Sequence, residues 1–283
     1  MASVAAQDLI NLETYPIHDG QSAAKSELLD NVRHQLADDG CAVLRGFVKA
    51  KHIDALVAEA DGVADKGHRS FNRTNAYFST DDSALPPSHP KRRFYDRSNS
   101  FIPADNFGSG SAIRAIYEWS VFRAFLQQAL QEERFFPYAD PLADVIINMA
   151  EEGGGFPWHF DTNDFTVTLA IQNSEEGGEF EYCPNLRSAD NENYDAVASV
   201  LDGAHAGVKT LELQPGDLQI FKGRCSLHRV KPLSGSRNRY VAIYSFVEEP
   251  EMVGSPERTH QLYGRVLPIH LERAGQRVDA LAD

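Results

Sequence analysis

The spacing of apolar residues in the first half of the chain predicts a helical layer over about residues 24–131. Leu29, Val32 and Leu36 recur at helical intervals and would form one apolar face. Gly40 follows them, and a glycine is common just past the end of a helix. The layer is predicted to contain three helices, at residues 24–38, 50–65 and 111–131, and one short strand at residues 41–48.

The stretch between the second and third predicted helices has a different composition. Residues 66–110 are rich in Ser, Asn, Pro and Arg, so we expect a long ordered loop there. Loops of that length in compact proteins are usually either functional or disordered. This region is therefore a candidate for contacts with a ligand.

From about residue 143 the apolar period changes to two. In residues 165–172 the apolar side chains occupy every odd position, as expected of a strand with one buried face. The pattern predicts an antiparallel sandwich or barrel over about residues 143–247, on which the helical layer packs. Because no linker or repeat divides the chain, we expect a single domain over residues 1–283 with residues 248–283 as a C-terminal extension. The predicted strands are residues 145–150, 165–172, 178–183, 208–213, 217–221 and 240–246.

Charge and composition exclude several classes of protein. The 283 residues include 27 basic and 41 acidic side chains, a net charge of −14, which disfavours nucleic acid as a partner. No run approaches the roughly 18 to 20 apolar residues that span a bilayer, and the N-terminus lacks the order of a signal peptide, so we expect a cytoplasmic protein that does not bind membranes. The three cysteines are widely spaced, which argues against a disulfide framework. The pattern specifies no oligomeric state.

Two good metal ligands lie close together in PWHFDTND, shortly after three consecutive glycines. His159 and Asp161 are two positions apart, so both side chains point to the same side of an extended stretch. His228, in DLQIFKGRCSLHRVKP, supplies a third ligand. Two histidines and one carboxylate on one face of a metal form the facial triad that suits non-haem Fe(II) and O₂ chemistry. A His-x-Asp pair alone is a weak signal, but its context of strands, turns and a distal histidine favours a metal site.

An arginine begins the strand that follows the distal histidine. Arg239 opens RYVAIYSF and would lie on a neighbouring strand, near the metal. A planar guanidinium binds a carboxylate through two parallel hydrogen bonds, so Arg239 could anchor a keto acid whose other end chelates the iron. Arg237 is the competing candidate, and its place in the turn SGSR favours a solvated residue.

These motifs resemble a known superfamily. The segments WHFDTNDFTVTLAIQ, GGEFEYCPNLR, PGDLQIFKGRCSLHRVKPLSG and RYVAIYSF are similar to the 2-oxoglutarate-dependent Fe(II) oxygenases, and most similar to the group of free-lysine radical halogenases and their amino-acid hydroxylase relatives. The likeness covers most of residues 28–265. It implies an α+β, mainly β fold, a double-stranded β-helix (jelly roll) with an N-terminal helical layer. It also implies that His159, Asp161 and His228 bind Fe(II) and that Arg239 anchors 2-oxoglutarate.

One position departs from the halogenases of that group. In them a small residue replaces the carboxylate ligand, which leaves a coordination position for chloride, whereas this chain has Asp161. The resemblance therefore implies hydroxylation, or a related oxidation, in place of halogenation.

Several residues are candidates for contacts with the substrate or co-substrate. Arg97, in the basic stretch KRRFYDR, could bind a substrate carboxylate, because the related enzymes use an arginine from this region; a solvated basic face is the alternative. Asp144 and Glu152 could meet a substrate amine or be exposed. Asn148 could hydrogen-bond the co-substrate or be an ordinary residue of the sheet. Trp158 is expected to pack beside the site.

The leading hypothesis is an Fe(II)- and 2-oxoglutarate-dependent dioxygenase that uses O₂ to hydroxylate an unactivated C–H bond of a small polar substrate, most simply a free amino acid. A second hypothesis keeps the iron but takes a peptide or protein side chain as substrate, held between the basic stretch and the acidic segment DNENYDAV. A third is a jelly-roll metal-binding module without turnover. Arg239 argues against the third, because such a module needs no carboxylate anchor.

Overall fold

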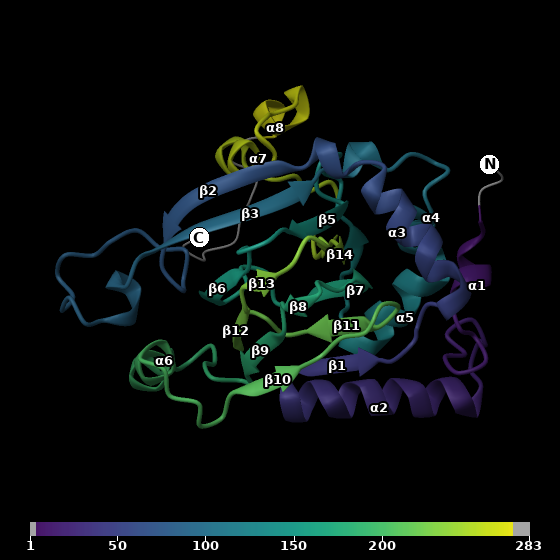
Figure 1. The fold of residues 1–283 in the computed structure, drawn as a ribbon. Helices are drawn as coiled ribbons and strands as arrows, with labels where there is room; N and C mark the ends of the chain where they lie inside the picture. The colour runs from purple at the N-terminus through teal and green to yellow at the C-terminus, as the bar shows by residue number, and fades with distance from the viewer. Residues whose placement is uncertain (1–3, 274–283) are drawn as a thin grey trace.

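The chain forms two antiparallel sheets, which Figure 1 shows in a computed structural model that describes residues 4–273. The larger sheet contains β1 (Cys41–Leu44), β2 (His68–Thr74), β3 (Tyr95–Ile102), β5 (Val145–Ala150), β7 (Thr166–Gln172), β11 (Leu218–Phe221) and β14 (Arg239–Tyr244), in the order β1-β11-β7-β14-β5-β3-β2. The smaller contains β6 (Phe156–His159), β9 (Phe180–Cys183), β10 (Lys209–Leu211) and β12 (Leu227–Val230), in the order β10-β9-β12-β6. Two short pairs join β13 (Leu233–Ser234) to β8 (Glu176–Gly177) and β15 (Phe246–Val247) to β4 (Phe136–Pro137).

The two sheets pack against one another and enclose the site described below. The rings of Phe180 in β9 and Phe221 in β11 are 5.1 Å apart in an edge-on arrangement. His228 in β12 lies 4.8 Å from the same Phe221 ring. A mainly antiparallel sandwich with an added helical layer is the predicted double-stranded β-helix, and each of the six predicted strand segments contains a strand.

The period of two divides the side chains of the larger sheet between two environments. In β14, Tyr240 and Tyr244 are buried in the main hydrophobic core. Arg239 and Val241, on the opposite face of the same strand, line a cavity between the sheets. The predicted alternation in β7 is confirmed in the same way, because one face of that strand is fully buried through Val167, Leu169 and Ile171.

Helices cover the outer face of the larger sheet and complete the main core. The helix α2 (Ala23–Asp39) ends at Gly40, whose φ of 62° is the left-handed conformation that favours glycine. The helix predicted over 111–131 is instead two helices, because Trp119 between them is extended, with ψ of 112°. Phe122 and Phe125 lie within this layer and are fully buried, and the burial of each side chain contributes roughly 1.5–3 kcal/mol to the free energy of unfolding. The layer consists of α1 (Ala6–Leu9), α2 (Ala23–Asp39), α3 (Ile53–Asp61), α4 (Ala112–Glu118) and α5 (Ser120–Leu130).

The expectation of a continuous loop over residues 66–110 is wrong. β2 and β3 form an antiparallel pair within this region, and β3 extends the larger sheet by pairing with β5. Neither strand shows an apolar alternation. β3 directs Arg97 into the cavity. β2 is the edge of the sheet, where even the Phe71 side chain is 72% exposed to solvent. The connection between the two strands projects beyond the sheet (Figure 1).

Further helices lie outside the predicted helical layer: α6 (Tyr194–Leu201), α7 (Pro256–Tyr263) and α8 (Pro268–Glu272). α7 packs against β2 and β3, so the C-terminal extension closes one side of the cavity (Figure 1). Residues 274–283 of that extension lie outside the described residues. Within residues 4–273, no helix is both long and apolar enough to cross a bilayer.

Candidate metal centre and its cavity

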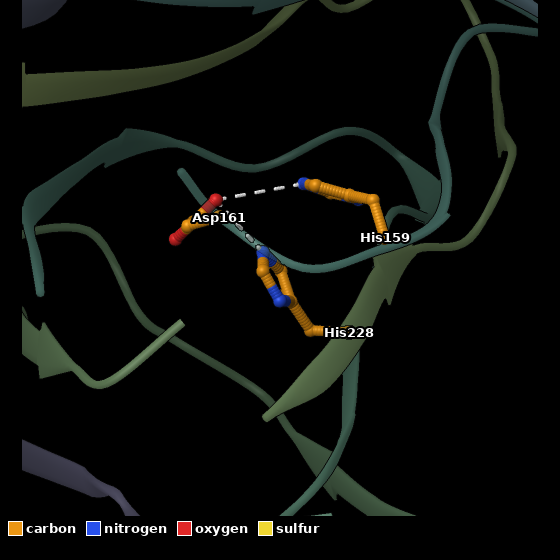
Figure 2. Close-up of side chains that lie close together, drawn as sticks. All are labelled: His159, Asp161 and His228. Atoms are coloured by element: carbon orange, nitrogen blue, oxygen red, sulfur yellow. Dashed lines mark ion pairs between the residues drawn. The ribbon is translucent and has the colours of Figure 1, made fainter. Parts of the chain in front are cut away.

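Strand register brings two histidines and one aspartate together. His159 ends β6 and His228 lies in β12, and the two residues are direct partners in the ladder, with ring centroids 4.1 Å apart. Asp161 follows β6 closely and returns its carboxylate toward both rings (Figure 2). One ligand atom from each residue lies within 4.8 Å of the others, so the group could hold a metal ion.

Backbone carbonyls orient the two imidazoles. His159 Nδ1 donates to the carbonyl of Pro157 at 2.7 Å, and His228 Nδ1 donates to the carbonyl of Ser226 at 2.9 Å. With the proton held on Nδ1, each Nε2 keeps a lone pair for a metal. Both Nε2 atoms face Asp161 Oδ1, at 3.7 Å from His159 and 3.3 Å from His228 (Figure 2).

The electrostatics of the group suit a divalent cation. Burial lowers the pKa of His159 well below its usual value, and the neighbouring His228 and Arg97 lower it further. Burial alone would raise the pKa of Asp161, but attraction to His228 and hydrogen bonds outweigh it and hold that pKa well below its usual range. A neutral imidazole and an ionised carboxylate are the forms that bind iron.

Two further residues fix the position of the Asp161 carboxylate. Thr166 Oγ1 donates a hydrogen bond of 2.7 Å to Asp161 Oδ2. Gly223 lies against the same carboxylate, and a Cβ at that position would overlap it. The backbone N–H of Asp161 also donates to the carbonyl of Gly223 at 3.1 Å. Gly223 was not predicted, because a single glycine in the turn KGRC gives no sign of the distant residue that it contacts.

Arg239 is placed as a carboxylate anchor would be. It begins β14, is 7% exposed and lines the cavity. No residue of the described chain forms an ion pair with it. Burial lowers its pKa to about 10, so it stays charged near neutral pH. The competing Arg237 is exposed and donates to the carbonyls of Asn173 and Ser174 at 2.9 and 3.0 Å, outside the cavity.

Asn148 offers a hydrogen bond in the same cavity. It lies in β5 opposite Val241 of β14, two residues along the strand from Arg239. Its side chain is buried, and Nδ2 is one of the buried polar atoms without a partner among the described residues. An unpaired buried amide is costly, and a ligand oxygen would remove that cost.

Arg97 also faces the cavity, from β3. Its guanidinium lies 4.8 Å from the ring of Phe78 and 4.4 Å from the ring of Phe156. Nε donates to Asn99 Oδ1 at 2.9 Å. Burial lowers its pKa to about 9, and the charge of Arg258 contributes to that shift. The alternative of a solvated basic face does not fit this environment.

The remaining sequence candidates lie elsewhere. Asp144 does not line the cavity, because Arg114 of α4 holds both of its carboxylate oxygens at 2.7 and 2.9 Å. The expectation that Asp144 meets a substrate amine is therefore corrected. Glu152 is exposed and lines a separate surface groove. Trp158 packs beside the site against a second apolar cluster, with the Arg229 guanidinium 4.6 Å from its ring.

The cavity has a volume of about 300 Å³ and includes residues that the sequence did not suggest. Phe78 comes from the connection between β2 and β3, whereas Arg258, Leu262 and Tyr263 come from α7. No sequence pattern marks these residues. In the structure Phe78 has a φ of 54°, which is unusual for an aromatic residue.

Known proteins resemble this chain in sequence profile and in fold. The profile of the Halogenase D family matches residues 24–264. The non-heme alpha ketoglutarate dependent carbocyclase SnoK from nogalamycin biosynthesis is 12% identical, with a TM-score of 0.53 over 89% of this chain and 91% of that one. The epimerase SnoN, in complex with Fe³⁺, alpha ketoglutarate and nogalamycin RO, is 12% identical, with a TM-score of 0.54 over 79% and 84%. AviO1 from Streptomyces viridochromogenes Tue57 is 14% identical, with a TM-score of 0.51 over 78% and 95%. At such identities the likeness establishes the fold. No curated protein matches the chain.

Proposed function

The chain belongs to the Halogenase D family, and we propose that it is an Fe(II)- and 2-oxoglutarate-dependent oxygenase that hydroxylates an unactivated C–H bond of a small polar molecule, most simply a free amino acid. The observation that carries this proposal is the convergence of His159, Asp161 and His228 within 4.8 Å inside a cavity. Two histidines and one carboxylate, with open positions beside them, suit non-haem iron.

Each residue of the cavity has a role in this proposal. The Nε2 atoms of His159 and His228 and the carboxylate of Asp161 would hold Fe(II). Arg239 would bind the distal carboxylate of 2-oxoglutarate, and Asn148 would donate a hydrogen bond to it. Iron bound there would supply oxygen activation, with 2-oxoglutarate converted to succinate and CO₂. The apolar residues around the site would exclude water.

Asp161 supports hydroxylation over halogenation within this family. If His159, His228 and this carboxylate held the iron, the carboxylate would occupy the coordination position that the halogenases of the group leave to chloride. The negative charge of Asp161 also disfavours a second anion beside the metal. Thr166 and Gly223 hold the carboxylate in place, so it cannot readily move aside for chloride.

Substrate-stimulated succinate formation tests this function. Protein loaded with Fe(II) and 2-oxoglutarate would be offered free amino acids in one series and peptide pools in another, in saturating chloride under ¹⁸O₂. We expect a free amino acid to stimulate succinate release and to gain one ¹⁸O atom, as measured by mass spectrometry. A chlorine isotope pattern in the main product would refute the hydroxylase assignment. Iron binding without succinate formation in either series would support a metal-binding module without turnover.

A further inference from the structure

Two consecutive glycines connect β8 to β9, and both have a positive φ, 71° at Gly177 and 75° at Gly178. Gly177 lies in the pair of β8 with β13, where a Cβ would overlap the carbonyl oxygen of Pro232. The close approach of these two backbones explains the first glycine. The second is different, because the three atoms nearest to a Cβ at Gly178 all belong to side chains. Its role therefore depends on what those side chains do.

The side chain of Arg239 is one of these neighbours. A Cβ at Gly178 would lie 3.2 Å from Cδ and 3.7 Å from Nε of Arg239. The shorter distance is below the roughly 3.5–4.0 Å at which two carbon atoms pack without repulsion. Any side chain at position 178 would therefore press on the stem of Arg239.

Ser174 is the other neighbour, and it limits how the turn can adjust. Its Oγ would lie 2.8 Å from the same Cβ. Ser174 is buried, and its Oγ donates a hydrogen bond of 3.0 Å to the carbonyl of Gly177. Because Ser174 is both buried and hydrogen-bonded, it cannot readily give way to a methyl group at position 178. The adjustment would therefore fall on Arg239.

Packing along its stem holds Arg239 in place. Within residues 4–273 its guanidinium donates no hydrogen bond and forms no ion pair. Arg239 lines the cavity, whereas Gly178 does not. Gly178 therefore contacts the arginine from the side that faces away from the cavity. Pressure from that side would advance the guanidinium into the cavity.

From these contacts we propose that Gly178 is a positioning residue that sets the chain length of the keto diacid that the cavity accepts. Because position 178 has no side chain, Arg239 lies back far enough to leave room for the five carbons of 2-oxoglutarate between its guanidinium and the candidate metal centre. A methyl group at position 178 would advance the guanidinium and favour a four-carbon keto diacid. This inference rests on the proposed function, in which Arg239 binds the distal carboxylate of the co-substrate.

Direct binding of keto diacids of increasing length tests the proposal. Titration calorimetry without oxygen, on protein loaded with Fe(II), would compare oxaloacetate, 2-oxoglutarate and 2-oxoadipate, which have four, five and six carbons. In Gly178→Ala we expect 2-oxoglutarate and 2-oxoadipate each to bind at least about fivefold more weakly, because Arg239 would meet their distal carboxylate out of place. Oxaloacetate binding should change by less than about twofold. Oxalate, which can chelate a metal but has no distal carboxylate, should bind as it does to wild type.

Further variants separate displacement of Arg239 from strain in the backbone. Gly207 has a φ of 83° and open space around its Cβ position, so Gly207→Ala adds similar strain without contacting Arg239. It should lower the free energy of unfolding, measured in denaturant, but leave every affinity unchanged. Ser174→Ala combined with Gly178→Ala removes the nearest obstacle to the new methyl group and should restore at least about twofold of the lost 2-oxoglutarate affinity. Ser174→Ala alone is the control for the double variant.

The outcomes distinguish this inference from the function on which it rests. Unchanged 2-oxoglutarate binding in Gly178→Ala, or an equal loss of affinity for all three diacids, would overturn the role of Gly178 in selecting length. Loss of oxalate binding in the same variant would also overturn it, because the residue would then support the whole site. In each of those cases, succinate formation by wild type would still support the oxygenase. Wild-type protein that binds Fe(II) and oxalate but no keto diacid would instead refute the proposed function, and the inference with it.

Discussion

The cavity has two walls that the chain builds in different ways. The strand wall carries the proposed iron and co-substrate contacts on or next to jelly-roll strands, through His159, Asp161, His228, Asn148 and Arg239. The outer wall comes from segments added around the jelly roll, through Phe78, Arg97, Arg258, Leu262 and Tyr263. Ladder hydrogen bonds fix the first wall and also β3, which carries Arg97, whereas side-chain contacts hold the other residues of the second wall.

This difference indicates how chemistry and substrate choice can vary separately. His159 and His228 are ladder partners, so moving one relative to the other would require a strand to slip. The outer wall depends on individual side-chain contacts, such as the buried pair of Asp140 and His270 beside α7. We therefore expect substitutions in the strand wall to impair the reaction itself and those in the outer wall to change what reacts.

The largest effect should follow removal of a candidate metal ligand. We expect His159→Ala, Asp161→Ala and His228→Ala each to lower Fe(II) affinity by at least about a hundredfold, because a three-ligand site has no spare member. Iron content after dialysis and succinate formation would measure the loss, with circular dichroism as the control for folding. Wild-type iron content and turnover in any one variant would show that the substituted residue is not a metal ligand.

The next effect concerns the support of the outer wall. His270→Ala removes one of the three hydrogen bonds to the buried Asp140 carboxylate and should cost up to about 3 kcal/mol of the free energy of unfolding. Substrate affinity should fall as well, because Asp140 also holds Gly254, just before α7. Fe(II) affinity of the folded variant should match wild type. Denaturant unfolding would measure the free energy of unfolding, and calorimetry would measure the affinities for substrate and Fe(II). If Fe(II) affinity fell as much as substrate affinity, the two walls would not be independent.

A smaller effect is expected within the strand wall at the co-substrate anchor. Arg239→Ala should weaken 2-oxoglutarate binding by roughly 1.5–3 kcal/mol, the contribution of a charge-assisted hydrogen bond. Arg237→Ala, whose guanidinium binds backbone carbonyls outside the cavity, is the matched control and should leave the 2-oxoglutarate dependence near wild type. A larger effect for Arg237 would show that the anchor is assigned to the wrong arginine.

The two walls also differ in how far the sequence predicts them. The strand wall could be predicted because its determinants are local: a period of two puts His159 and Asp161 on one side, and Arg239 begins a clear strand. Gly223 escaped prediction because its role is a contact with the distant Asp161.

Arg97 was suggested only by resemblance, and β3, which carries it, was missed, because a strand that directs polar side chains into a cavity shows no apolar alternation. Phe78 and Arg258 depend on where residues 75–94 and 256–263 pack, and no local pattern specifies that. Asp144 was misassigned because the partner that holds it, Arg114, lies in a different element.

The smallest effect concerns the backbone of the outer wall. Phe78 has a φ of 54°, which costs a non-glycine residue free energy, and its ring contacts both Arg97 and His159. Phe78→Ala and Phe78→Gly both remove the ring, so both should weaken substrate binding by a similar factor. Only glycine relieves the backbone, so the glycine variant should be more stable than the alanine variant by up to about 1 kcal/mol in denaturant unfolding. Equal stability of the two variants would show that residue 78 is not held at positive φ, and unchanged substrate affinity in both would exclude its ring from the substrate contacts.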